Sequence, residues 1–234
     1  MRAGIETAAM DVLMVRLFDT IEESNMAWII AADRALRDAF GKTLIDLVPS
    51  YTTLMVHYDC RVLAHGEAHR RIRETLENLQ PADTQAGQRH EIPVWYDESV
   101  GPELQRVSER AGIAIETLIR RHCNHDYCVF ALGFAPGYGF MGLVEEALAT
   151  PRLETPRRKV AAGSVGIAGR QTAIYPLPSP GGWNILGRTA VPLFEHARRG
   201  DPLLKPGDRV RFLSISRDEF EAQGGDTTPL EERP

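Results

Sequence analysis

Apolar positions follow helical spacing in two early parts of the chain and a strand-like pattern between them. Apolar residues recur at helical intervals over residues 26–40, and the run ends at Gly41, a residue type that caps helices. β-Branched and aromatic residues over 45–59 predict strand structure, and helical spacing returns over 67–80. The order helix, strand, helix predicts a small N-terminal α/β domain.

The second half of the chain has a different pattern. It begins with a predicted strand over 90–97 and two predicted helices over 101–112 and 114–122. Between residues 127 and 217, short apolar runs are separated by glycine and proline. This rhythm favours a β-barrel or a β-sandwich.

A polar segment without periodicity, residues 81–89, predicts the linker between these regions. We therefore expect an α+β chain, with an N-terminal α/β domain over 1–88 and a β-barrel domain over 89–220. Residues 221–234 are rich in Gly, Pro and acidic residues, and we expect them to form a disordered tail.

Composition excludes several classes of protein. The chain has 234 residues, of which 43% are hydrophobic and 25% are charged, a balance typical of globular proteins. Because 27 Lys and Arg oppose 32 Asp and Glu and no dense basic run occurs, we expect no nucleic-acid partner. Three cysteines are too few for a disulfide framework. The apolar runs are far shorter than the roughly 20 residues that span a bilayer. We expect a cytoplasmic protein without a membrane partner.

Two segments suggest other functions but favour a structural interpretation. The segment HCNHDYC, residues 122–128, places two histidines and two cysteines together. Structural zinc sites usually combine two separated ligand pairs, and no second pair occurs, so we expect no metal site. Residues 107–121 can be aligned with a helix-turn-helix that turns at Gly112, but the second helix is short and carries Glu116. We expect both helices to pack against the barrel.

The segment 163–188 contains six glycines, three prolines and one tryptophan. Glycines in such a segment either form turns or let backbone N–H groups approach an anion closely, and Gly181 and Gly182 are adjacent. The same segment offers hydrogen-bonding groups, aromatic rings and a cation, on Ser164, Gln171, Tyr175, Ser179, Trp183 and Arg188. This combination favours a ligand cradle.

Three longer motifs carry a resemblance to a known family. They are LGFAPGYGFMG at 132–142, a glycine-rich motif at 155–189 and DPLLKPGDRVRF at 201–212. In this order they resemble the allophanate hydrolase subunit 1 family, of the type carboxyltransferase domain, subdomain C and D. That family includes the B-type subunit of 5-oxoprolinase and KipI-like inhibitors of sporulation kinases. The resemblance implies a small N-terminal α/β domain followed by a cyclophilin-like β-barrel.

The resemblance also implies an activity and partners. The implied activity is the ATP-dependent opening of the 5-oxoproline lactam to glutamate, with Mg²⁺ accompanying ATP and the nucleotide bound by or shared with a partner subunit. The implied partners are a C-type subunit and a third, A-type subunit. Two alternatives remain. One is a regulatory protein that binds a sensor histidine kinase, and the other is a carboxyltransferase-type subunit of a urea or allophanate amidolyase.

For the lactam reaction, the site must hold phosphate groups and a developing oxyanion. As catalytic residues we expect Arg188, Gln171, Ser164 and His57, the last of which ends a predicted strand two residues before Asp59. We expect substrate to be bound by Arg157, Gly169, Tyr175, Ser179, Gly181, Gly182, Trp183, Phe134 and Pro136. These residues include no obvious nucleophile and base pair, so we expect the chain to be inactive without its partners.

Overall fold

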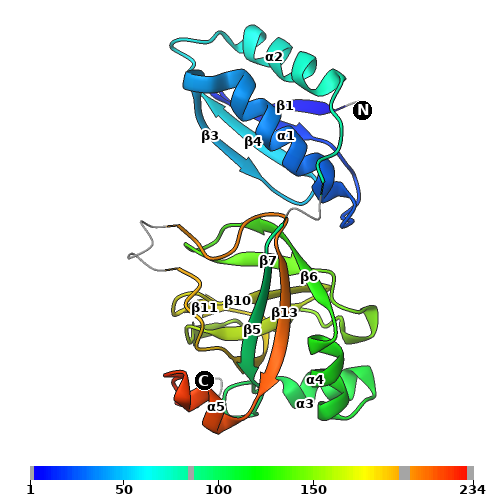
Figure 1. Cartoon of the computed structure of the whole chain (residues 1–234), viewed down its shortest axis with the longest axis vertical. Helices are drawn as coiled ribbons and strands as arrows, with labels where there is room; N and C mark the ends of the chain where they lie inside the picture. Colours follow the sequence, from blue (N-terminus) through cyan, green and yellow to red (C-terminus); the bar gives the residue numbers. More distant parts are fainter. Residues whose placement is uncertain (1–2, 84–86, 195–200, 231–234) are drawn as a thin grey trace. The chain divides into compact units, whose positions relative to one another are not determined.

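The N-terminal unit contains a four-stranded sheet whose two central strands alternate in burial. The computed structural model describes residues 3–83, 87–194 and 201–230, and the chain divides into two compact units, Met1–Gly87 and Gln88–Pro234 (Figure 1). The first unit consists of β1 (Gly4–Ala9), β2 (Val12–Arg16), α1 (Asn25–Phe40), a 3-10 turn at Gly41–Thr43, β3 (Leu44–Pro49), β4 (Thr53–Tyr58) and α2 (His65–Glu77). The boundary between the units falls within the segment 81–89.

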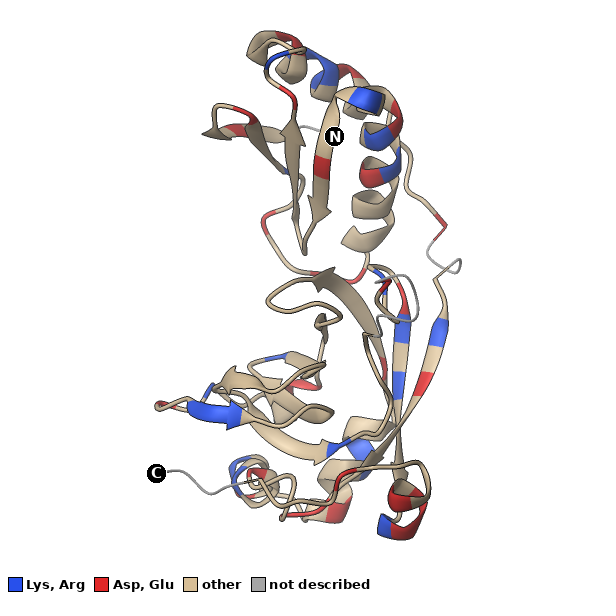
Figure 2. Cartoon of the chain, turned by 90° about the vertical axis from the view of Figure 1, so that its left-hand side faces the viewer, with Lys and Arg blue, Asp and Glu red and all other residues tan. Residues whose placement is uncertain are grey.

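The four strands of the first unit are antiparallel in the order β1-β2-β4-β3. Leu13 and Val15 on β2, and Leu54 and Val56 on β4, are fully buried, because every second side chain of a strand points to the same face. α1 contacts β3, β4 and α2. In Figure 2 the ribbons of both helices are coloured for residues of both charges, as expected of helices with one face in solvent.

The helix over 26–40 is confirmed as α1, but the sequence prediction for the first unit was incomplete. β1 and β2 precede α1 and were not predicted. Residues 45–59 form two strands, since a turn closed by a 2.8 Å bond from the Ser50 N–H to the Thr53 carbonyl separates β3 from β4.

The second unit contains a closed barrel with the strand order β10-β7-β6-β13-β5-β12-β9, and confirms the predicted α+β fold class. Its strands are β5 (Arg89–Trp95), β6 (Asp126–Leu132), β7 (Gly139–Gly142), β9 (Ser164–Ala168), β10 (Gln171–Ile174), β12 (Asn184–Arg188) and β13 (Arg209–Ile215). A separate antiparallel pair joins β8 (Arg157–Val160) to β11 (Ser179–Gly181). Side chains such as Val165, Ile167 and Phe212 fill one core cluster of this unit.

The two predicted helices are α3 (Leu104–Ala111) and α4 (Ile115–Cys123), and a short 3-10 turn follows later at Glu146–Leu148. α3 ends at Gly112, whose φ of 65° lies in the left-handed region that favours glycine. Leu104, Val107 and Leu118 belong to the same buried cluster as the strand residues. The helices therefore pack on the barrel, as predicted.

His122, at the end of α4, is fully buried and stacks on Phe212 with ring centroids 4.7 Å apart. Thr172 donates to the Gly166 carbonyl, so its oxygen accepts the bond from His122 Nε2 at 3.2 Å, and Nδ1 accepts from the Tyr96 hydroxyl at 2.8 Å. Burial lowers the pKa of His122 to about 3. Within the described parts of the chain, no three His, Cys, Asp or Glu side chains gather closely enough to hold a metal ion.

The expectation of a disordered tail is wrong for residues 221–230. α5 (Arg217–Ala222) begins with a capping box between Ser216 and Glu219. Leu230 is 9% exposed, and its N–H donates to the Ser99 carbonyl at 2.8 Å. Residues 231–234 lie outside the described residues. None of the helices formed by the described residues has the length and apolarity that crossing a bilayer requires.

Candidate functional site

A small aromatic pocket opens beside the β8–β11 pair. It has a volume of about 120 Å³. Its lining residues come from the β6–β7 loop, β7, the segment before β8, and the region around β11, namely Phe134, Tyr138, Phe140, Arg152, Tyr175, Pro180, Gly181, Gly182 and Trp183. The pocket therefore combines rings, backbone without side chains and one cation.

Tyr138 is the centre of the aromatic cluster. Its ring meets those of Tyr175 and Trp183 nearly edge to face, with centroids 5.3 Å and 6.1 Å apart and interplanar angles of 88° and 86°. Phe140 adds a tilted contact to Tyr138 at 4.9 Å. These contacts join the rings into one packed cluster, of which only small parts are exposed in the pocket.

Unlike the buried Tyr138, Phe134 is largely exposed, with 66% of its surface accessible. Its backbone φ is 70°. A positive φ is a strained conformation for a bulky residue, and such strain clusters at binding sites. Its ring meets Tyr138 at 5.2 Å in a T-shaped contact. The β6–β7 loop thus holds an apolar ring at the mouth of the pocket.

Tyr175 is almost fully buried. Burial raises the pKa of its hydroxyl, although hydrogen bonds from Tyr138 and from the Trp183 backbone oppose this shift. Since the pKa is raised, the phenol is protonated at neutral pH.

Gly181 and Gly182 form the wall opposite these rings. A Cβ at residue 181 would overlap the Tyr175 hydroxyl, so only glycine fits there without displacement. At Gly182 a Cβ would meet Pro156 and Leu153 at ordinary contact distance, 3.6 Å. The close approach of backbone to ring is therefore a property of Gly181 alone.

Arg152 supplies the positive charge of the pocket. Its guanidinium lies over the Trp183 ring, 5.9 Å from the centroid. Arg152 is exposed and has no ion pair with any residue that the structure describes. An anionic group of a ligand can therefore pair with it.

The structure brings together five of the residues expected to bind substrate, namely Phe134, Tyr175, Gly181, Gly182 and Trp183. Pro136 is exposed in the same loop as Phe134 but does not line the pocket. Ser179 begins β11, and its hydroxyl oxygen is buried without a hydrogen-bond partner. Gly169, with φ 57°, occupies the β9–β10 turn, where its N–H donates to the Thr150 carbonyl at 2.7 Å. Gln171 is the first residue of β10 and pairs with Ala168 of β9.

Arg157 is placed differently from the prediction. Its guanidinium is buried and paired with Glu103, which accepts from Nη1 at 3.0 Å and from Nη2 at 2.5 Å. Glu103 also accepts from the Ile185 N–H at 2.9 Å. The charge of Arg157 is therefore neutralised within the fold, where it links β8, α3 and β12.

Arg188 and Ser164 lie outside the aromatic pocket. Arg188 is 2% exposed and lines a separate cavity of about 140 Å³. Burial lowers the pKa of its guanidinium, while Asp226 raises it. Ser164 is fully buried and is the direct cross-strand partner of Arg188.

His57 belongs to the N-terminal unit, on β4, where its Nε2 lies 3.1 Å from a carboxylate oxygen of Asp11. Asp59 pairs with Arg61 instead, and hydrogen bonds from Arg61 lower its pKa to about 2. The structure therefore does not bring His57 together with Asp59 as an acid and base pair.

Sequence reasoning missed four residues of the pocket. Tyr138 and Phe140 lie in the motif 132–142, from which only Phe134 and Pro136 were selected, so the aromatic residues of that motif were an available signal. Pro180 lies between two residues that were selected. Arg152 stands in a segment with several arginines, and only contacts distant in sequence distinguish it from Arg157.

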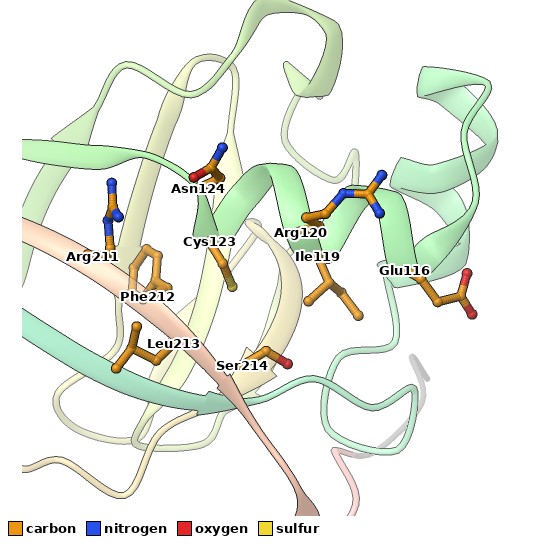
Figure 3. Close-up of a pocket in the computed structure, with 9 residues that line it drawn as sticks. All are labelled: Glu116, Ile119, Arg120, Cys123, Asn124, Arg211, Phe212, Leu213 and Ser214. Atoms are coloured by element: carbon orange, nitrogen blue, oxygen red, sulfur yellow. The ribbon is translucent and has the colours of Figure 1, made fainter.

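A larger groove of about 780 Å³ lies between α4 and β13 (Figure 3). Figure 3 shows Ile119 and Cys123 of α4 directed toward the part of β13 that holds Leu213 and Ser214. The charged residues that line it include Arg211, whose Nε donates a hydrogen bond to Asp126 Oδ1 at 2.8 Å. The groove contains none of the residues expected from the sequence to bind substrate.

Comparisons with known proteins agree with the fold and the motifs. Residues 3–204 match the family model for carboxyltransferase domain, subdomain C and D. The chain is 34% identical over 232 residues to the B-type 5-oxoprolinase subunit of Bacillus subtilis (strain 168), an alignment that covers 94% of this chain and 96% of that protein. It is 40% identical to the B-type 5-oxoprolinase subunit of Haemophilus influenzae over 83% of this chain and 88% of that protein.

Among solved structures, TTHA0988 superposes with a TM-score of 0.77 and 40% identity over 88% of this chain. The chain spans 40% of the length of TTHA0988. The same fold thus occurs both in a chain of this length and as part of a longer one.

Proposed function

Because the chain belongs to the family of the carboxyltransferase domain, subdomain C and D, we propose that it is the B-type subunit of a 5-oxoprolinase, an ATP-dependent hydrolase complex. The proposal is supported by relatives of that name that match most of the chain. Within this proposal the protein acts in the cytoplasm, as expected from the sequence.

The observation that carries the proposal is the aromatic pocket with the cation of Arg152 beside it. The substrate, 5-oxoproline, is a five-membered lactam ring with one carboxylate. A ring of this size suits the small, largely apolar pocket, and its carboxylate suits the cation of Arg152. The volume of about 120 Å³ is below the roughly 300 to 1,000 Å³ of pockets for drug-sized ligands, so a small ring fits and a nucleotide does not.

The chemistry requires activation of a stable amide. Transfer of the γ-phosphoryl group of ATP to the lactam oxygen releases ADP and makes that oxygen a leaving group. Water then adds to the same carbon, and the C–N bond breaks as the nitrogen takes a proton, which leaves an acyl phosphate. A second water hydrolyses this acyl phosphate and yields phosphate and glutamate. Before the phosphoryl transfer, the protonated Tyr175 hydroxyl can donate to the lactam oxygen and hold it in place.

The described residues that line the pocket include no carboxylate and no histidine. A group that activates water must therefore come from elsewhere in the assembled enzyme. We propose that a C-type subunit completes the site, that an A-type subunit is also needed, and that ATP and its Mg²⁺ are bound by or shared with a partner subunit.

Reconstitution tests this function. The purified chain is combined with C-type and A-type subunits, and ADP formation is measured with and without 5-oxoproline. We expect lactam-dependent ADP formation only when all three subunits are present. Full turnover without this chain would contradict the proposal, as would stable binding to a sensor histidine kinase with no turnover in any mixture.

A further inference from the structure

Residues 226–230, which we term the C-terminal strap, cover the side chain of Arg188. Arg188 Nη1 donates to the carbonyl oxygens of Asp226 at 2.6 Å and of Thr228 at 2.8 Å. No carboxylate among the described residues forms an ion pair with Arg188. A guanidinium that is 2% exposed is thus satisfied mainly by neutral carbonyl groups.

Two buried polar atoms at this place have no partner. They are Nε of Arg188 and the hydroxyl oxygen of Ser164. Arg188 on β12 and Ser164 on β9 are direct cross-strand partners, so their side chains emerge on the same face of the sheet. Most buried polar groups of folded proteins have a hydrogen-bond partner, so two unpartnered atoms on neighbouring residues mark a place where a ligand can bind.

The cavity that Arg188 lines has a volume of about 140 Å³ and contains a second cation. Lys159 of β8 lines it and has no ion pair with any residue in the described ranges. The strap supplies the remaining wall, in which Asp226 places the one carboxylate of the cavity. That carboxylate accepts a bond from the Thr228 N–H at 2.9 Å and so belongs to the fold of the strap itself.

We propose that Arg188 and Lys159, with Ser164 next to Arg188 on the neighbouring strand, form a binding site for a small oxyanion, a carboxylate or a phosphate group, which the C-terminal strap occupies in the unliganded chain. The carbonyl groups of the strap take the Arg188 donors that the anion would use. Release of the strap also removes Asp226, whose negative charge would repel the ligand. This site is distinct from the aromatic pocket, and its existence does not depend on the proposed reaction.

The strap is held by contacts that an anion can outcompete. Leu230 packs against a cluster with Tyr175 and Trp183, and its N–H bonds to Ser99, which anchors one end. An oxyanion offers charge-assisted bonds to Arg188, and these are about twice as strong as bonds to neutral carbonyl groups. Because the anion and the strap compete for Arg188, the closed strap lowers anion affinity by the same factor by which the bound anion disfavours the closed strap.

The test uses the full chain with inorganic phosphate and acetate as probes. Calorimetry measures affinity, and hydrogen exchange measures opening of the strap at the Leu230 amide. We expect phosphate to accelerate exchange at Leu230 and Arg188→Gln to weaken binding about tenfold or more. Leu230→Ala, which loosens the strap, should bind roughly fivefold more tightly or better.

Two further variants complete the design. Lys159→Gln should weaken binding without affecting folding, because this side chain is exposed. Arg158→Gln is the matched control, since it removes one charge from the same strand but does not line the cavity. If Arg188→Gln fails to fold, Lys159→Gln and Leu230→Ala still decide the matter.

Binding of both probes identifies a general oxyanion site, whereas binding of one alone identifies its ligand class. Absence of binding would overturn the proposal. So would equal affinity of the wild type and all three site variants, or a bound anion that slows exchange at Leu230.

Discussion

The Tyr175 hydroxyl occupies the space that a Cβ at Gly181 would need. This contact fixes the distance between the aromatic rings and the glycine wall of the pocket. A side chain at Gly181 is therefore expected to be costly, whereas one at Gly182 would meet its neighbours at ordinary contact distance.

Gly181→Ala should destabilise the chain by about 1–3 kcal/mol, because the added methyl group forces Tyr175 out of its packed position. For a protein of this size, that corresponds to a fall in Tm of roughly 2–12 °C. Gly182→Ala is the control, since its Cβ would lie at 3.6 Å from its neighbours. Equal melting temperatures for the two variants would show that the close contact is not important.

A second prediction about stability concerns the buried ion pair between Arg157 and Glu103. Glu103→Ala leaves the guanidinium and the Ile185 N–H without their acceptor, and loss of one partner of a buried pair costs about 3–5 kcal/mol. Urea unfolding measures this loss. Glu74→Ala, which breaks an exposed pair with Arg70, should leave stability nearly unchanged. A small effect for Glu103→Ala would mean that the pair is not essential to the barrel.

His122 predicts a dependence of stability on pH. Its pKa falls from 6.5 in the unfolded chain to about 3 in the folded one, because burial disfavours the imidazolium. Between these values the unfolded state binds more protons, so stability falls as pH decreases from about 6.5 toward 3. The slope approaches about 1.4 kcal/mol per pH unit for one group.

The measurement compares unfolding free energies at pH 7 and pH 5, where most carboxylates remain ionised. His122→Gln should flatten the decline between these two values, even if it lowers stability at both. A decline of the same size in this variant would assign the pH dependence to other groups.

We predicted correctly those parts of the fold that have a strong local sequence pattern. α1 combines sustained periodicity with Gly41 as its cap, and the glycine and proline rhythm after residue 127 indicated strands. β1 and β2 were missed because β1 is almost entirely exposed and β2 has only five residues, so neither has a strong local signal. The ordered strap was missed because a polar composition does not reveal the anchoring of Leu230.

The candidate site shows the same limit. Tyr175, Gly181 and Trp183 are neighbours in sequence and could be grouped from it. The roles of the three arginines could not, because they depend on distant partners. Arg157 pairs with Glu103, which is 54 residues away in the sequence, and Arg188 donates to strap carbonyl groups that are 38 to 40 residues away. Arg152 instead lies over Trp183 in the pocket.

The KM for 5-oxoproline of the reconstituted enzyme tests most directly whether the aromatic pocket holds the lactam. Arg152→Gln should raise this KM by about tenfold or more, because a charge-assisted bond to the substrate carboxylate is lost, while the KM for ATP stays unchanged. Arg158→Gln, which removes an equal charge outside the pocket, should leave both constants as in the wild type. A KM for 5-oxoproline that is the same in Arg152→Gln and Arg158→Gln would contradict the account.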